Sequence, residues 1–115
     1  MSSLVKILKT QVAEEKKYFT HPAEYARKIK NLAKKKLTAP KVFLFGSAVT
    51  GEWSPSSDID LLVVSPSVPK KQHQRAKIKA KLYQEICLFS PFEIHLITPE
   101  EFLWYERFID KKMEI

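Results

Sequence analysis

The strongest constraint on the fold is a run of four consecutive apolar residues, 42–45, that ends at Gly46. A strand with apolar side chains on both faces must be covered on both faces, which is typical of α/β proteins. Further strands are predicted over residues 59–64 and over residues 92–98, where apolar and polar side chains alternate. The sequence therefore predicts a small β-sheet covered by helices.

Apolar residues at helical spacing predict the helices around these strands. Two helices, over about residues 3–18 and 22–37, precede the sheet, and a basic helix over about 70–88 connects the second and third strands. A last helix begins at Pro99, with the Thr98 hydroxyl as its cap. Its residues predicted to pack on the sheet are Phe102, Leu103, Tyr105 and Phe108.

The chain length predicts one domain, because 115 residues lie within the usual range for a single hydrophobic core. Within it we expect N-terminal helices over residues 1–38, a catalytic core over 41–98 and a C-terminal helix over 99–110. The only cysteine, Cys87, excludes an intramolecular disulfide and a cysteine-based metal cage, and it is expected to be a buried thiol. No apolar run is long enough for a signal peptide or a membrane span, so a cytoplasmic location is expected.

The net charge of +7 is unevenly distributed, with basic residues concentrated over residues 27–41 and 70–81. Such stretches fit an anionic partner, either nucleic acid or an acidic protein. They equally fit solvated lysine faces of amphipathic helices. Composition alone leaves both interpretations open.

Polar residues follow or begin the predicted strands where phosphate chemistry would need them. Gly46 and Ser47 follow a buried strand and open a helical turn, where backbone N–H groups can face a phosphate, although an ordinary turn has the same pattern. Asp58 and Asp60 are two residues apart at the head of a strand, which predicts two carboxylates on one face. Their mutual repulsion is relieved if they bind Mg²⁺; otherwise Asp58 caps the loop and Asp60 is solvated.

Glu93 supplies a third carboxylate, predicted to be buried or half-buried because Phe92 and Ile94 flank it. If its strand lies beside the strand of Asp60, the carboxylates converge on one site; otherwise Glu93 pairs with a lysine. His95 shares the face of Glu93, but no histidine in the sequence has the spacing of a zinc site and none is assigned a catalytic role.

The Gly46-Ser47 pair, ten intervening residues, and Asp58-x-Asp60 before an apolar strand together resemble the signature of the DNA polymerase β-like nucleotidyltransferase superfamily, in its minimal branch. The resemblance implies an α/β (α+β) nucleotidyltransferase fold with a small mixed sheet. It implies that Gly46 and Ser47 contact the triphosphate, and that Asp58 and Asp60 bind two Mg²⁺ ions. Glu93 would be the third catalytic acid and metal ligand, where many relatives have Asp.

The function implied by this resemblance is transfer of a nucleotide, AMP from ATP, to a hydroxyl group. Minimal relatives are often paired with a helical HEPN-type protein in toxin–antitoxin modules, which implies a protein acceptor and a stable complex. A homo-oligomer is the other expected assembly. Trp53, Trp104 and Tyr105 could anchor an interface, although core packing is preferred for Trp104.

Two other functions compete with nucleotide transfer. One is an antitoxin or adaptor that keeps the fold and binds nucleotide or partner without turnover. The other is a nucleic-acid-binding protein that uses the lysine-rich faces, which would bind with steep salt dependence and without need for the carboxylates.

Overall fold

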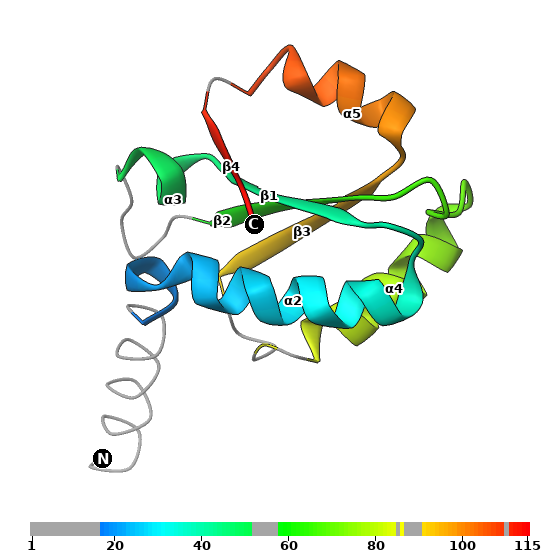
Figure 1. The fold of residues 1–115 in the computed structure, drawn as a ribbon, viewed down its shortest axis with the longest axis horizontal. Helices are drawn as coiled ribbons and strands as arrows, with labels where there is room; N and C mark the ends of the chain where they lie inside the picture. Colours follow the sequence, from blue (N-terminus) through cyan, green and yellow to red (C-terminus); the bar gives the residue numbers. More distant parts are fainter. Residues whose placement is uncertain (1–16, 52–57, 85, 87–90, 110) are drawn as a thin grey trace, which may run out of the picture.

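The computed structural model describes residues 17–51, 58–84, 86, 91–109 and 111–115. Within these residues a four-stranded sheet has the order β3-β2-β1-β4 (Figure 1). Its strands are β1 (Lys41–Phe45), β2 (Ile59–Val64), β3 (Phe92–Ile97) and β4 (Lys112–Glu114). β2 and β3 are parallel, whereas β1 is antiparallel to both β2 and β4. The predicted mixed sheet is therefore confirmed.

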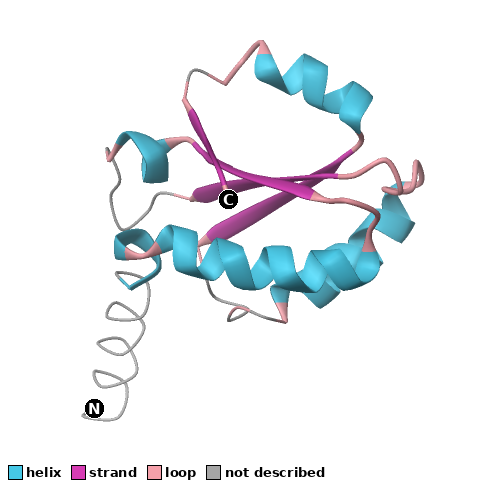
Figure 2. Cartoon of the chain, in the orientation of Figure 1, coloured by secondary structure: helices cyan, strands magenta, loops and turns pink. Residues whose placement is uncertain are grey.

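Helices cover both faces of this sheet (Figure 2). α2 (Pro22–Lys36) and α4 (Gln72–Tyr83) lie on one face, and α5 (Pro99–Glu106) lies on the other (Figure 1). α3 (Ser47–Thr50) is a single turn after β1. The predicted α/β class is confirmed, and the described helices include none long and apolar enough to cross a membrane.

α2 and α4 differ in how closely they follow the prediction. α2 starts with proline in its first turn and ends with three lysines, which suit the negative end of the helix dipole. α4 ends at Tyr83, earlier than the predicted residue 88. Twelve helical residues span about 18 Å, close to the about 20 Å of a six-residue strand, so α4 is about as long as the strands that it covers.

The apolar core is divided by the sheet into two clusters, as the run at 42–45 requires. Val42 and Leu44 face α2 and α4, whereas Phe43 faces α5. The strand residues on the α2 and α4 side are joined by buried residues such as Ile29 and Leu82. The smaller cluster contains buried residues of three strands, with Phe45, Phe102, Tyr105 and Ile109 packed against it.

The packing of α5 partly corrects the sequence prediction. Phe102 and Tyr105 pack against the sheet as expected, but Leu103 and Phe108 are 67% and 70% exposed. Trp104 is 57% exposed, so the preference for core packing was wrong. Successive helical residues are about 100° apart, so the turn that directs positions 102 and 105 to the sheet directs positions 103 and 104 to solvent. Phe108 lies in the turn after α5, because the helix ends at Glu106 and not at the predicted residue 110.

One element was not predicted, and some predictions lie beyond the described residues. β4 has only three residues, too few to show a periodic pattern. Residues 17–20 are helical, but the rest of the helix predicted over 3–18 lies outside the described part of the chain. The same is true of the loop that contains Trp53 and of Cys87.

Candidate functional site

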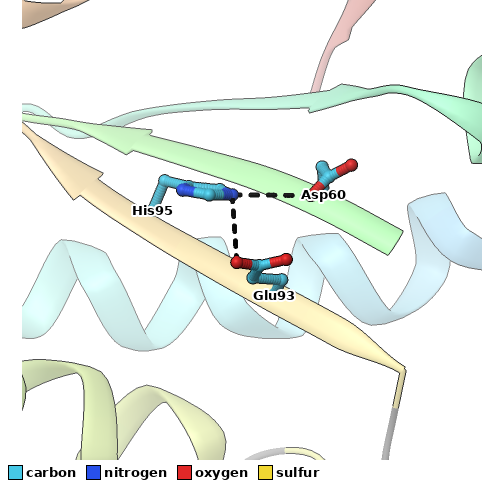
Figure 3. A group of neighbouring side chains, drawn as sticks. All are labelled: Asp60, Glu93 and His95. Carbon is cyan, nitrogen blue, oxygen red and sulfur yellow. Dashed lines mark hydrogen bonds and ion pairs between the residues drawn. The ribbon is translucent and has the colours of Figure 1, made fainter. Parts of the chain in front are cut away.

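Three polar side chains meet on the α5 face of the sheet: Asp60 from β2, and Glu93 and His95 from β3 (Figure 3). One possible ligand atom from each of them lies within 4.8 Å of the other two. His95 Nε2 is 3.4 Å from Asp60 Oδ1 and 4.0 Å from Glu93 Oε1. The imidazole therefore connects the two carboxylates.

Strand alternation and register produce this cluster. Ile59 and Leu61 point toward α2 and α4, so Asp60 between them points to the opposite face. The parallel register places Asp60 beside Glu93, and alternation returns His95 to the face of Glu93. The predicted convergence of Glu93 on Asp60 thus results from the pairing of two strands that are distant in the sequence.

Exposure differs among the three side chains. Those of His95 and Asp60 are 25% and 27% exposed, whereas that of Glu93 is 53% exposed. The prediction of a buried or half-buried Glu93 was wrong, because β3 is the edge strand of the described sheet and Glu93 opens to solvent there. No described lysine or arginine forms an ion pair with Asp60 or Glu93. The chain has a net charge of +7 and therefore many basic residues, yet none of the described ones neutralises these carboxylates. Both carboxylates therefore remain available to a cation.

The turn at Gly46 lies directly beside Asp60, because Phe45 is the residue opposite Asp60 in the β1–β2 register. Gly46 has a φ of +78°, and a Cβ at this position would lie 2.8 Å from Asp60 Oδ2. Its carbonyl accepts hydrogen bonds from the backbone N–H groups of Val49 and Thr50. The structure thus requires glycine here, while contact of Gly46 and Ser47 with a triphosphate stays a prediction.

Asp58 has a different position from its predicted partner. It immediately precedes β2 and is exposed, and the three-residue cluster does not include it. Residues 52–57, which lead to it, lie outside the described residues. The structure therefore joins Asp60 to Glu93, and the metal-binding role of Asp58 stays a prediction.

His95 is the residue of the cluster to which sequence reasoning gave no role. Its ring centroid lies 5.6 Å from that of Phe45 and 6.0 Å from that of Tyr105, so two aromatic side chains limit its movement. The signal in the sequence was the two-residue spacing of Glu93 and His95 on one strand. Without the register between β2 and β3, that spacing could not show that His95 reaches Asp60.

The donor set suits a divalent cation. Two carboxylates provide the hard oxygen ligands preferred by Mg²⁺ and Mn²⁺, and an imidazole nitrogen extends the set toward transition metals such as Zn²⁺ and Fe²⁺. Gly46 leaves room next to the Asp60 carboxylate that any other residue would occupy. The residues present therefore fit a metal ion, and Gly46 carries no side chain that would crowd its Asp60 ligand.

Comparison with known proteins identifies the family. The profile of the nucleotidyltransferase domain matches residues 26–113. A crystal structure provisionally described as a nucleotidyltransferase is 32% identical, with a TM-score of 0.64 over 77% of this chain and 95% of that chain. A second, from Sulfolobus solfataricus, is 17% identical, with a TM-score of 0.61 over 90% of this chain and 85% of that chain, and supports the fold alone. No curated protein matched the sequence. From the family match and the 32% identical structure together, the chain belongs to the nucleotidyltransferase domain family.

Proposed function

We propose that this protein is a Mg²⁺-dependent enzyme that transfers a nucleotide, AMP from ATP, to a hydroxyl group. The observation that carries the proposal is the in-register placement of Asp60 and Glu93 beside the Gly46 turn. The family is one of nucleotidyltransferases, and no described lysine or arginine neutralises the two carboxylates beside this turn, which supports a role for them in binding a metal ion.

Asp60, Glu93 and, from the motif, Asp58 are the proposed metal ligands, with His95 as an added candidate. Two bound Mg²⁺ ions would stabilise negative charge on the attacking hydroxyl oxygen, on the α-phosphate and on the leaving pyrophosphate. The protein's part is to hold its carboxylates in place before the substrate arrives. The strand backbone fixes Asp60 and Glu93, and the contact from His95 Nε2 holds one oxygen of Asp60.

The remaining residues are assigned to substrate binding and proton transfer. Gly46 lets the triphosphate approach the backbone closely, because it carries no side chain, and Ser47 follows it at the start of α3. Glu93 is the most exposed member of the cluster and is the proposed acceptor of the hydroxyl proton. An acceptor hydroxyl can reach it from the open edge of the sheet.

Transfer of label from α-phosphate-labelled ATP into the components of a host lysate tests the proposal. We expect Asp60→Asn and Glu93→Gln each to lower Mg²⁺-dependent labelling by at least about 100-fold, because each removes charge stabilisation from the site. The matched control is Glu100→Gln, which removes a carboxylate from the first turn of α5 and should label like wild type. Circular dichroism checks that each variant is folded. Equal labelling by wild type and Asp60→Asn would reject the assignment.

A protein is the proposed class of acceptor, with a HEPN-type partner as the specific candidate from the resemblance. Its support in the structure is a set of exposed apolar side chains, Leu103 and Trp104 on α5 and Phe108 in the turn after it. The same lysate experiment identifies the acceptor by the mass of the labelled species. A labelled small molecule or nucleic acid in place of a protein would refute this part while leaving the transferase intact.

A non-catalytic antitoxin or adaptor is the alternative function, and the same exposed apolar side chains favour it. It predicts that the Asp58→Asn, Asp60→Asn double variant still binds the partner and retains biological function. Loss of function with retained partner binding would instead support the enzyme.

A further inference from the structure

β4 forms an outer edge of the sheet, and its sequence suits pairing with another strand (Figure 1). Among the described strands it pairs with β1 alone. Lys112, Met113 and Glu114 are all exposed, and Met113 is an apolar side chain with 47% of its surface open. An unpaired edge presents backbone donors and acceptors that can serve as a template for a further strand.

The backbone groups that point outward from β4 follow from its pairing with β1. The Ile115 N–H donates to the Val42 carbonyl at 2.8 Å, which makes residues 115 and 42 a hydrogen-bonded pair. In an antiparallel ladder such pairs alternate, so Met113 also directs its backbone groups to β1. Lys112 and Glu114 therefore direct theirs away from the sheet.

We propose that the outer edge of β4 binds the β4 strand of a second copy of this chain, antiparallel and centred on Met113. In this register Lys112 lies opposite Glu114 of the second copy, and Glu114 lies opposite its Lys112. These are also the residues whose backbone groups point outward, so they form the hydrogen-bonded pairs. Met113 faces its own counterpart in the closely spaced pair, which covers its exposed side chain.

The side chains of these pairs also lie on matching faces. The register with β1 places Glu114 opposite Phe43 and Lys112 opposite Phe45, so both charged side chains lie on the α5 face. Residues directly opposite in an antiparallel pair share a face, and a two-fold axis through the Met113 pair keeps that face common to both copies. Two four-stranded sheets would thus join into one, with both candidate sites on the same side.

Charge selects this register over its neighbours. A shift of the centre to residue 112 would place two Lys112 side chains opposite each other, and a shift to residue 114 would oppose two Glu114 side chains. Lys112 is already held 3.2 Å from Glu106 and lies over the rings of Phe43 and Phe102. Glu114 forms no ion pair with the described residues, so it is the charge that gains a partner.

Lysine residues on short edge strands can also protect against pairing. Here the charges on either side of the apolar Met113 have opposite signs, so each charge meets its complement when two β4 strands pair. A strand edge that protects against pairing would place like charges opposite each other. A three-residue strand buries less than the roughly 1,200 Å² of a standard stable interface, so the expected dimer is weak. Association should be measured at protein concentrations up to about 1 mM, the weak end of the affinity scale.

A charge exchange between two variants tests both the partner and the register. Lys112→Glu and Glu114→Lys should each be monomeric by sedimentation equilibrium, because every homodimer would contain two like-charge pairs. Their equimolar mixture should dimerise, because each variant then offers the charge that the other needs. Lys111→Glu is the control with the same change in net charge as Lys112→Glu, and it should dimerise like wild type because it lies opposite Ile115.

The mixing step distinguishes two reasons why a variant could be monomeric. Lost charge complementarity between copies is restored by the second variant, whereas a disturbed Lys112–Glu106 ion pair within one copy is not. A wild-type protein that stays monomeric at about 1 mM would overturn the proposal. So would a mixture that stays monomeric while circular dichroism shows both variants folded.

Covalent capture tests the same register if a charge variant does not fold. With Cys87 replaced by serine, Met113→Cys should form a disulfide-linked dimer under mild oxidation, because a closely spaced antiparallel pair has Cα atoms about 4.5 Å apart. Lys111→Cys should not, because its counterpart lies about 13 Å away along the strand. Equal cross-linking of the two variants would reject the register.

Discussion

At the scale of single residues, Gly46 links the backbone of the turn to the position of Asp60. Its φ of +78° is unfavourable for any residue with a Cβ, and the Cβ would meet Asp60 Oδ2 at 2.8 Å. Gly51 provides a natural comparison, because its φ is +80° but no atom lies within 4 Å of its hypothetical Cβ. The two glycines share the backbone constraint and differ in contact with the site.

Gly46→Ala is therefore expected to lose both stability and activity, whereas Gly51→Ala loses stability alone. Each left-handed alanine costs about 1–2 kcal/mol, which urea denaturation can measure. Only Gly46→Ala displaces the Asp60 carboxylate, so its labelling activity should fall at least about 10-fold further than that of Gly51→Ala. Equal loss of activity in the two variants would show that backbone strain, and not contact with Asp60, is what matters.

The sequence predicted some members of the site and not others for a physical reason. Gly46 and Asp60 lie at the ends of two strands of one antiparallel pair, where local pattern indicates a turn and an acid. The position of His95 depends on the register of β2 with β3, which no local pattern contains. The exposure of Glu93 depends on β3 being an edge strand, which is also a property of the whole sheet.

At the scale of elements, one buried arginine ties α4 to α5. Arg75 lies on α4 and forms two contacts with the Glu101 carboxylate, at 2.8 and 3.1 Å. It also donates to the backbone carbonyls of Pro69 and Leu96. Glu101 in turn completes the capping box with Thr98, which the sequence indicated only in part through the threonine hydroxyl before Pro99.

The stability of the protein should depend on the ionisation of Glu101. The hydrogen bond from Arg75 lowers the pKa of this carboxyl below its ordinary value, more than burial raises it, and hydrogen bonds from Thr98 act in the same direction as Arg75. A carboxyl with a lowered pKa in the folded state stabilises that state above its unfolded pKa. This contribution is lost as the pH falls through the folded pKa.

Glu101→Gln should therefore lower the free energy of unfolding at pH 7, and its difference from wild type should shrink below about pH 5. Urea denaturation from neutral to acid pH measures both. Glu100→Gln is the control, since Glu100 forms no ion pair with the described residues. If the difference in free energy of unfolding between wild type and Glu101→Gln stayed constant down to acid pH, packing and not charge would account for the effect of the substitution.

At the scale of the whole molecule, the layer arrangement follows from sequence patterns because it depends on long elements. The run at 42–45 required cover on both faces, and α2, α4 and α5 provide it. The short β4 and the outward side of α5 were not predictable, because three residues show no period and an apolar side chain does not reveal its direction. The division into one domain over residues 1–115 stays a prediction.

Binding of Mg²⁺ with a non-hydrolysable ATP analogue should stabilise the whole fold. A ligand that binds only the folded state, present at ten times its Kd, adds about 1.4 kcal/mol, which corresponds to a rise in Tm of about 5 °C for a domain of this size. Differential scanning fluorimetry should show this rise for wild type and its loss on adding EDTA. In Asp60→Asn the rise should be absent; the same rise in that variant would place the nucleotide elsewhere.

The parallel register of β2 and β3 limits how the distance between Asp60 and Glu93 can change. Sliding one strand by a single residue moves its side chains about 3.3 Å and turns them to the other face, so the distance between the acids has no gradual adjustment through the backbone. Fine adjustment is left to side-chain length. Glutamate at position 93 extends the carboxylate by about 1.5 Å beyond that of an aspartate, the length of one carbon–carbon bond. With the strands unchanged, the separation of the two carboxylates can thus be altered through one methylene group at position 93.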